Sequence, residues 1–201
     1  MRDAEDERAR YPCPACGQPL FGWTAGSHPL DGSKIVMDHC ESCGLVVTRG
    51  RSSPDLDSEL PRLEGGSTLL ANQRSFAAGV GAAQWARLRP DEHRLHMTPR
   101  AAELLYAGRD EEVEVVGTPF SFAAYLGMLQ TMINAFTLRD NFLTNVRRGR
   151  VHPQTLRKRL AFALDAIVSL LVVIPLAIVA LPTELVGSAF GRGNLMEVRR
   201  S

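Results

Sequence analysis

The pattern of apolar and polar positions divides the chain into several parts. Residues 1–10, MRDAEDERAR, contain no apolar run, which predicts a solvated, disordered tail and not a signal peptide or a span. Residues 11–50 are rich in Cys, Gly and Pro, and residues 51–64 are polar with two prolines, as is typical of a linker. Residues 65–118 show a mixed helix and strand pattern, and most of the remainder is helical and apolar.

Short elements are predicted within residues 65–118. The segments STLLA (Ser67–Ala71) and VEVVG (Val113–Gly117) are apolar or β-branched, which predicts strands. Thr98 followed by Pro99 is a helix-start signal, so we expect a helix from Pro99 that ends at Gly108.

Residues 119–159 form an amphipathic and basic helical region, which begins with a longer helix opened by Thr118 and Pro119. Apolar side chains recur there at helical spacing, at Phe122, Leu126, Leu129, Ile133 and Phe136. The positions opposite them are polar, at Gln130, Asn134 and Thr137. The apolar stripe favours core packing, and attachment to a membrane surface is the alternative.

Residues 160–190 contain the longest apolar run, Leu160–Leu181, which is long enough to cross a bilayer. Basic residues precede it and place that side in the cytoplasm, at Arg139, Arg147, Arg148, Arg150, Arg157, Lys158 and Arg159. Asp165 lies within two turns of the start of the run, where we expect it near the bilayer interface. A full span, a re-entrant hairpin broken near Pro175, and a helix buried within a soluble oligomer are the alternatives.

All the cysteines fall into two pairs, Cys13 with Cys16 and Cys40 with Cys43, each in a C-x-x-C-G motif. The glycine after each pair lets the backbone turn so that its N–H groups face the sulfurs. Four thiolates complete a tetrahedral shell without an open position, so residues 11–50 predict a structural zinc ribbon in a reducing compartment. An iron–sulfur centre and a pair of redox dithiols are the alternatives.

The charge balance does not favour nucleic acid as a partner. The net charge of the chain is +1, and the ribbon mixes its few basic residues with Asp31, Asp38 and Glu41. A phosphate-binding surface needs clustered Lys and Arg. His28 and His39 are spare imidazoles beside the ribbon, and we interpret them as ordinary loop residues because four cysteines already complete the shell.

The segment DEHRLHMTP places His93 and His96 three residues apart, just before the predicted helix. Metal ligands, a catalytic acid and base, and a polar entry to the helix are all compatible with that spacing. The metal interpretation is weakened because the strong metal motif lies elsewhere and is complete.

Four segments, taken in order, carry a family resemblance: Glu64–Ser75, Gln84–Leu105, Glu112–Ser121 and Gly191–Arg200. Together they resemble the C-terminal, acceptor-side half of class I S-adenosylmethionine-dependent methyltransferases, in a bacterial group that acts on lipids, sugars or quinone-like acceptors. Several members of that group begin with a zinc ribbon. The resemblance implies that residues 191–201 contain a closing strand that pairs with Val113–Val116, and that His93 and His96 face the acceptor pocket.

The resemblance omits the half that binds the cofactor. The family uses a strand, an acidic residue and a G-x-G-x-G loop, and there is no room for them between Cys43 and Gly65. Gly79-x-Gly81 and Gly191-x-Gly193 lack the preceding acidic residue and strand, and Asn72 stands where the family has proline. No cofactor-binding residue is therefore assigned, and S-adenosylmethionine is not expected to bind.

The expected fold is α+β: a zinc ribbon joined to a truncated Rossmann-like remnant of about three strands, with a hydrophobic helical insert. A single span would separate the closing strand from its partner, a conflict that a hairpin would resolve, and both arrangements stay open. The expected function is non-catalytic, with zinc as the cofactor, the membrane as a partner, and a protein partner at the exposed sheet edge. The alternatives are a methyltransferase subunit whose partner supplies the cofactor half, and a membrane-tethered ribbon that binds nucleic acid.

Overall fold

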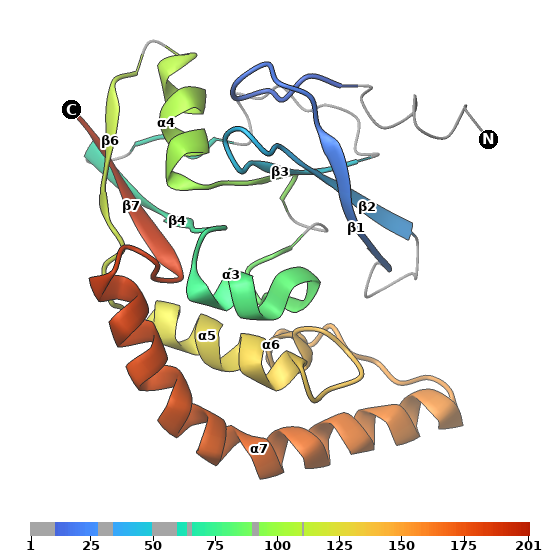
Figure 1. Ribbon diagram of the computed structural model, residues 1–201. Helices are drawn as coiled ribbons and strands as arrows, with labels where there is room; N and C mark the ends of the chain where they lie inside the picture. Colours follow the sequence, from blue (N-terminus) through green and yellow to red (C-terminus); the bar gives the residue numbers. More distant parts are fainter. Residues whose placement is uncertain (1–10, 28–33, 50–59, 64–65, 90–92, 110) are drawn as a thin grey trace.

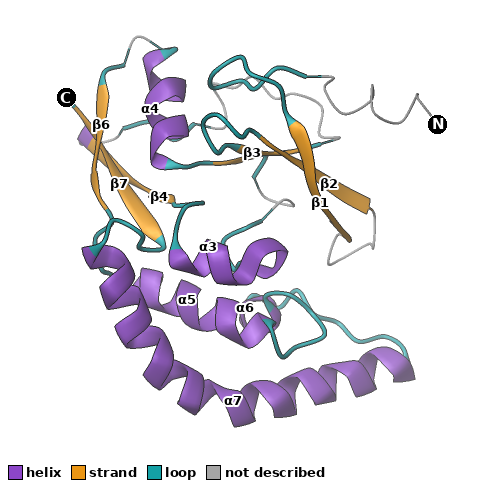
Figure 2. Cartoon of the chain, in the orientation of Figure 1, coloured by secondary structure: helices purple, strands orange, loops and turns teal. Residues whose placement is uncertain are grey.

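A computed structural model describes residues 11–27, 34–49, 60–63, 66–89, 93–109 and 111–201. The predicted tail at 1–10, His28 and most of the predicted linker at 51–64 lie outside the described residues. The described part confirms a mixed class of helices and strands, with two antiparallel sheets and a cysteine cluster near its N-terminal end (Figures 1 and 2).

The first sheet joins the cysteine-rich segment to the middle of the chain. Its order is β1-β2-β3-β5, formed by β1 (Phe21–Ser27), β2 (Lys34–His39), β3 (Val46–Thr48) and β5 (Leu95–His96). All its pairings are antiparallel, and β3 pairs with β5 through Val46 with His96 and Val47 with Leu95. The predicted ribbon therefore extends its sheet into the DEHRLHMTP segment.

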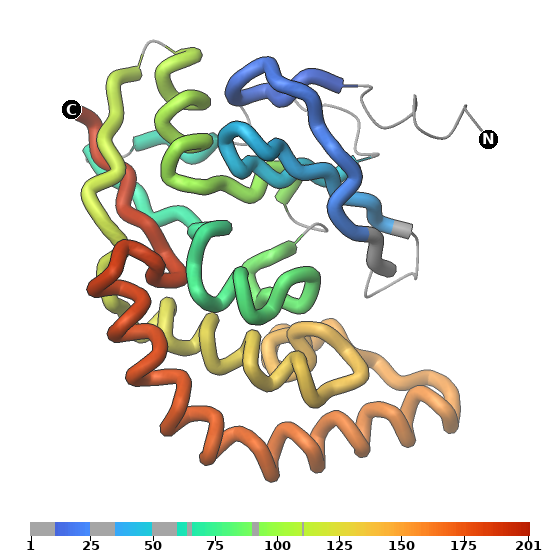
Figure 3. Tube along the Cα trace, in the orientation of Figure 1, coloured from blue at the N-terminus to red at the C-terminus, as the bar shows by residue number. Residues whose placement is uncertain are grey.

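The second sheet has three strands in the order β4-β7-β6, which are β4 (Ser67–Ala71), β7 (Leu195–Arg200) and β6 (Val113–Gly117). The strand β7 lies between β4 and β6 and runs antiparallel to both (Figure 3). A strand near the end of the chain is therefore the central strand between two strands from its middle. The expected pairing between the closing strand and the segment around Val113–Val116 is confirmed.

Most helices begin at a side-chain cap, as short-range signals predict. The described helices are α3 (Phe76–Gly81), the 3₁₀ turn η3 (Ala82–Gln84), α4 (Pro99–Ala107), α5 (Phe122–Asn134), α6 (Phe142–Arg147) and α7 (Leu156–Ala189), of which α3, α4, α5 and α7 begin at a side-chain cap. The predicted start and end of α4 are confirmed, because the Thr98 hydroxyl accepts from the Ala101 N–H and the C-cap is Gly108. The predicted start of α5 is wrong by three residues, since its cap is Ser121 and the Thr118 hydroxyl donates to the Ser188 carbonyl instead.

The core-packing prediction for α5 is wrong at several positions. Leu129 and Ile133 are buried, but Phe122, Leu126 and Phe136 are exposed. The polar face is buried instead, with Gln130, Asn134 and Thr137 inside the protein. It satisfies its own hydrogen bonds, because Gln130 Nε2 donates to Asn134 Oδ1 and Asn134 Nδ2 donates to the Gln84 carbonyl, at 2.8 and 2.7 Å.

Two hydrophobic cores hold the chain together. The first combines Cys13, Cys40 and Cys43 with residues of β4, α4 and β7, including Leu105 and Met196, so the ribbon and the second sheet share one interior. The second lies among the helices, where α5 packs between α3 and α7 (Figure 1). The cysteine-rich segment is therefore packed as part of the larger unit.

The helix α7 is continuous over 34 residues and curves around α5 and α6 (Figure 1). It runs through Pro175 and Pro182, and it bends near its middle, where Pro175 lies. The hairpin alternative does not describe this helix, because the segment bends but does not reverse. The second sheet still closes, since the end of α7 returns directly to β7 beside β6.

Candidate functional site

Each cysteine pair lies in a tight turn, and the glycine after the pair adopts the backbone conformation that this turn requires. Gly17 and Gly44 have φ of 74° and 76°, in the left-handed region that favours glycine. Their N–H groups donate to the carbonyls of Cys13 and Cys40, both at 2.8 Å. The two turns have the same form, so they present their sulfurs in equivalent ways.

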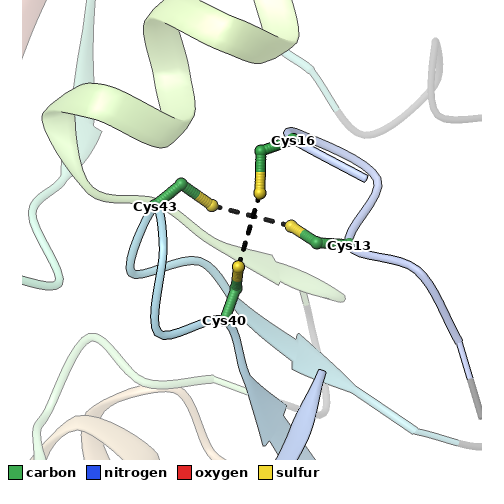
Figure 4. Close-up of side chains that lie close together, drawn as sticks. All are labelled: Cys13, Cys16, Cys40 and Cys43. Carbon is green, nitrogen blue, oxygen red and sulfur yellow. Dashed lines mark hydrogen bonds between the residues drawn. The ribbon is translucent and has the colours of Figure 1, made fainter. Parts of the chain in front are cut away.

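The two turns bring the four sulfurs of Cys13, Cys16, Cys40 and Cys43 together, within 4.8 Å of one another. Cys13 Sγ lies 3.6 Å from Cys43 Sγ, and Cys16 Sγ lies 3.4 Å from Cys40 Sγ, along two crossing directions (Figure 4). A tetrahedral ion with Zn–S bonds of about 2.3 Å places its sulfurs about 3.8 Å apart, close to this arrangement. The cysteines are not paired as disulfides. The cluster could therefore hold a metal ion.

Burial sets the acidity of these thiols. Burial raises the pKa of Cys13 to about 11, partly offset by N–H groups of its own turn, and burial also raises the pKa of Cys43. Burial opposes ionisation of Cys16 as well, but hydrogen bonds from Gln18 and Cys40 lower its pKa to about 7. A bound cation would compensate the cost of burying further thiolates.

The second cysteine turn is hydrogen-bonded directly to the start of α4. Thr98 Oγ1 donates to the Cys43 carbonyl at 2.5 Å, and the same oxygen accepts from the Ala101 N–H at 3.1 Å. A Cβ added at Gly44 would lie 2.7 Å from Thr98 Cγ2, so glycine also permits this close approach. One threonine therefore caps α4 and holds the second cysteine turn.

The two candidate histidines lie in different environments. His93 is exposed, whereas His96 is buried with its Nε2 3.5 Å from Thr48 Oγ1. Burial, and then the proximity of His93, lower the pKa of His96 to about 3, so its ring is neutral at physiological pH. Within the described residues, the group that could hold a metal contains the cysteines and neither of these histidines. His39 is not in that group either.

His93 and His96 do meet at a cleft of about 670 Å³. Its apolar lining includes Leu69 and Leu70 of β4, Met97, and Leu126 of α5. Its polar lining includes Arg87, Arg89, Gln130 and Arg148. None of the described residues that line the cleft is acidic. Sequence reasoning missed the arginines, because they come from separate segments that only the fold brings together.

The helix α7 has a reversed distribution of polarity. Its exposed side is apolar and is called here the outer face: Leu160, Leu164, Ile167, Leu170, Leu171, Ile174, Ile178, Val179, Leu181, Leu185 and Val186. Its buried side carries Asp165, Ser169 and Glu184. A helix on the surface of a soluble protein has the opposite arrangement, with apolar residues inward and polar residues outward.

The buried acids of α7 bond to the protein. Asp165 is 1% exposed, and its Oδ1 accepts from the Leu138 N–H at 2.7 Å, with Arg139 Nε 4.0 Å from Oδ2. Glu184 is also 1% exposed and accepts from the Asn194 N–H at 2.7 Å. Asp165 therefore faces the protein and not the exposed side of α7. The signal that could have found both residues is their isolation as the only acids in an apolar helix.

Within the described residues, α7 is the one helix long and apolar enough to cross a membrane, with a mean hydropathy of 2.7 over its best window. Only 17% of that window is buried. Both its length and its exposure distinguish it from a core helix.

Comparison with known proteins gives no match, whether to a family model, to a curated protein or to a solved structure. The function of this chain is therefore argued from its own geometry.

Proposed function

We propose that this chain is a non-catalytic, membrane-surface protein that is stabilised by a structural zinc ribbon. In this proposal α7 lies in the plane of the bilayer, with its outer face among the lipid chains. The observation that carries the proposal is the reversed polarity of α7: Leu170 is 75% exposed, while Asp165 and Glu184 are each 1% exposed. Apolar side chains gain by burial, and a lipid surface provides it for a whole helix face.

The attachments of α7 favour an in-plane helix over a span. Asp165, in its first half, bonds to Leu138 between α5 and α6. Glu184, in its second half, bonds to Asn194 at the start of β7, which pairs with β4 and β6. A transmembrane orientation would place these two attachments at different depths of the bilayer, although they belong to one packed unit.

Charge supports a membrane with anionic lipids. The exposed side chains of Arg147, Arg148, Arg150, Arg157, Lys158 and Arg159 precede or begin α7. Each Lys or Arg near an anionic surface contributes about 1 kcal/mol. These residues would lie at the headgroups while the outer face lies deeper.

Zinc is the ion we assign to the cysteine cluster. Four sulfurs at near-tetrahedral spacing form a closed shell, which suits a structural ion and leaves no position for a reacting water. A bound ion in such sites contributes about 10–16 kcal/mol. Because Cys13, Cys40 and Cys43 share a core with the second sheet, that free energy would stabilise more than the ribbon.

An origin from a methyltransferase, without its cofactor half, is part of the proposal. It is supported by the sheet β4-β7-β6, in which the closing strand pairs with the segment around Val113–Val116, as the resemblance implies. Gly79 lies within α3, and Gly81 is the last residue of that helix. A cofactor loop would precede a helix, so this glycine pair is unlike one. Titration calorimetry with S-adenosylmethionine should show no binding, and micromolar binding would contradict this part.

Vesicle flotation tests the membrane assignment. The zinc-loaded protein should float with vesicles that contain anionic phosphatidylglycerol and less with pure phosphatidylcholine. Replacing Leu170 and Ile174 by Glu should reduce flotation at least about tenfold, because two charges would enter the apolar layer. Val80→Glu is the matched control, since Val80 is 71% exposed but lies on α3 and does not belong to the outer face of α7. Equal flotation of all three proteins would reject the proposal.

The orientation is tested with an epitope tag at each end of the chain. A protease added outside sealed vesicles should remove both tags if α7 lies in the plane. Protection of only one tag would establish a span and reject the in-plane arrangement, while leaving membrane association intact.

A further inference from the structure

The cleft beside β4 is lined by residues from several separate parts of the fold. Leu69–Ala71 of β4 form one side, and residues from Leu95 to Met97 form another. Arg87 follows η3, Gln130 lies on α5, and Arg148 lies at the end of α6. A volume of about 670 Å³ lies within the range of pockets that hold drug-sized ligands, about 300–1,000 Å³.

The charged part of the cleft favours an anion. Arg87, Arg89 and Arg148 are among the residues that line it, and the described lining residues include no Asp or Glu. The Nη2 of Arg87 donates to the Ala123 carbonyl at 2.6 Å, but its Nε is buried and has no acceptor among the described residues. Arginine forks match phosphate and carboxylate oxygens in pairs.

The remaining part of the cleft is apolar and only partly covered. Leu69 is 51% exposed and Leu126 is 37% exposed, although both line the cleft. Met97 and Leu70 lie deeper and are buried. An aliphatic chain placed along these side chains would remove apolar surface from water, which inorganic phosphate would not do.

We propose that this cleft binds one amphiphile at a time, with a terminal phosphate monoester at the arginines and an aliphatic part along Leu69 and Leu126. A phosphate monoester is preferred because three arginines line one cleft, and it offers more oxygens than a carboxylate and more net charge than the zwitterionic head of phosphatidylcholine. This binding differs from attachment of the outer face to a bilayer, since the ligand is a single molecule held in the cleft; Arg148 is the residue that both arrangements use.

The test uses the full zinc-loaded chain in an uncharged maltoside, titrated calorimetrically with dihexanoyl phosphatidic acid below the concentration at which that lipid aggregates. Because no bilayer is present, the result does not depend on the proposed membrane attachment. Dihexanoyl phosphatidylcholine and inorganic phosphate are titrated in parallel. We expect saturable binding of one phosphatidic acid, and weakening of at least about tenfold for the other two probes.

Variants then locate the site. Arg87→Gln and Arg148→Gln should each weaken binding about tenfold, through loss of a charge-assisted contact. Arg100→Gln is the matched control, because Arg100 is exposed on α4 and does not line the cleft. Leu69→Glu should weaken binding more than Leu69→Gln, and this pair keeps the test decisive if Arg87→Gln fails to fold.

Four outcomes would overturn the proposal. Equal affinity for inorganic phosphate would make the site one for free phosphate, and equal affinity for phosphatidylcholine would remove the role of the arginines. Binding that does not saturate would show only general charge attraction between the lipid and the protein. The same conclusion would follow if Arg100→Gln weakened binding as much as Arg87→Gln.

Discussion

The indole of Trp85 donates from Nε1 to Oδ1 of Asn194 at 2.8 Å, and both side chains are buried. The same asparagine donates from Nδ2 to the Ala124 carbonyl at 3.1 Å, and its N–H bonds to Glu184. One side chain at the start of β7 thus joins the segment after η3 to α5, and its backbone reaches α7.

This connection predicts a graded loss of stability. Asn194→Ala leaves the buried Trp85 N–H without its acceptor and removes the additional bond to the Ala124 carbonyl of α5, so we expect the free energy of unfolding to fall by about 1–3 kcal/mol. Trp85→Phe removes a single donor along with part of a ring and should cost less. Urea unfolding followed by circular dichroism measures both. If Asn194→Ala costs less than Trp85→Phe, Asn194 does not organise this junction.

Removal of the metal should loosen the second sheet as well as the ribbon. Cys40 and Cys43 share a core with Leu105 of α4 and Met196 of β7, so these elements lose packing when the cysteine turns open. We expect a chelator to increase hydrogen exchange in α4 and β7, with α5 and α7 changed less. Increased exchange restricted to residues 11–49 would show that the ribbon unfolds independently.

We expect Thr98 to couple retention of the proposed zinc ion to the stability of the first turn of α4. Thr98→Val removes both the cap of the Ala101 N–H and the bond to the Cys43 carbonyl, so we expect a loss of about 1–3 kcal/mol and faster metal release. Thr155→Val is the matched control, since Thr155 caps α7 at the Lys158 N–H and lies at an exposed site. Metal transfer to a chromogenic chelator measures the rate. Equal rates in the two variants would contradict the link.

Glu184 should make stability depend on pH. Burial raises the pKa of this carboxyl, against smaller opposite effects of the Asn194 N–H and Arg87. A carboxyl whose folded pKa is raised favours folding more as pH falls through that pKa, and this contribution is lost as pH rises. Glu184→Gln cannot ionise, so we expect it to flatten the dependence of unfolding free energy on pH between mildly acidic and neutral values. An unchanged profile would show that Glu184 does not titrate differently in the folded state.

Local signals predicted the parts of the fold that depend on neighbouring residues. Thr98 and Gly108 bound α4 as expected, because capping involves groups only a few residues apart. The start of α5 was missed because the hydroxyl of Thr118 is taken by the Ser188 carbonyl, seventy positions away. No short-range pattern contains that contact.

The candidate site likewise has one part that short-range patterns predict and another part that only the fold brings together. The cysteine cluster follows from spacing, since two C-x-x-C-G turns can be recognised without a fold. The apolar stripe of α5 predicted the wrong buried face, because Gln130 and Asn134 bond to each other and so can be buried. The cleft depends on Arg87 and Arg148, which lie 61 positions apart and meet only when α6 packs beside α5.

Substitution of Asp165 distinguishes an α7 that lies in the plane of the bilayer from an α7 that spans it. In a span, Asp165→Leu would remove a charge from the bilayer and should strengthen insertion. In the arrangement proposed here, the carboxylate faces the protein and accepts from the Leu138 N–H, so the leucine leaves that donor unpaired and Arg139 without its nearby charge. We expect Asp165→Leu to lower the unfolding free energy by about 1–3 kcal/mol without improving vesicle flotation. Asp165→Asn keeps an acceptor and should cost less. Stronger flotation by Asp165→Leu, with unchanged stability, would favour the span.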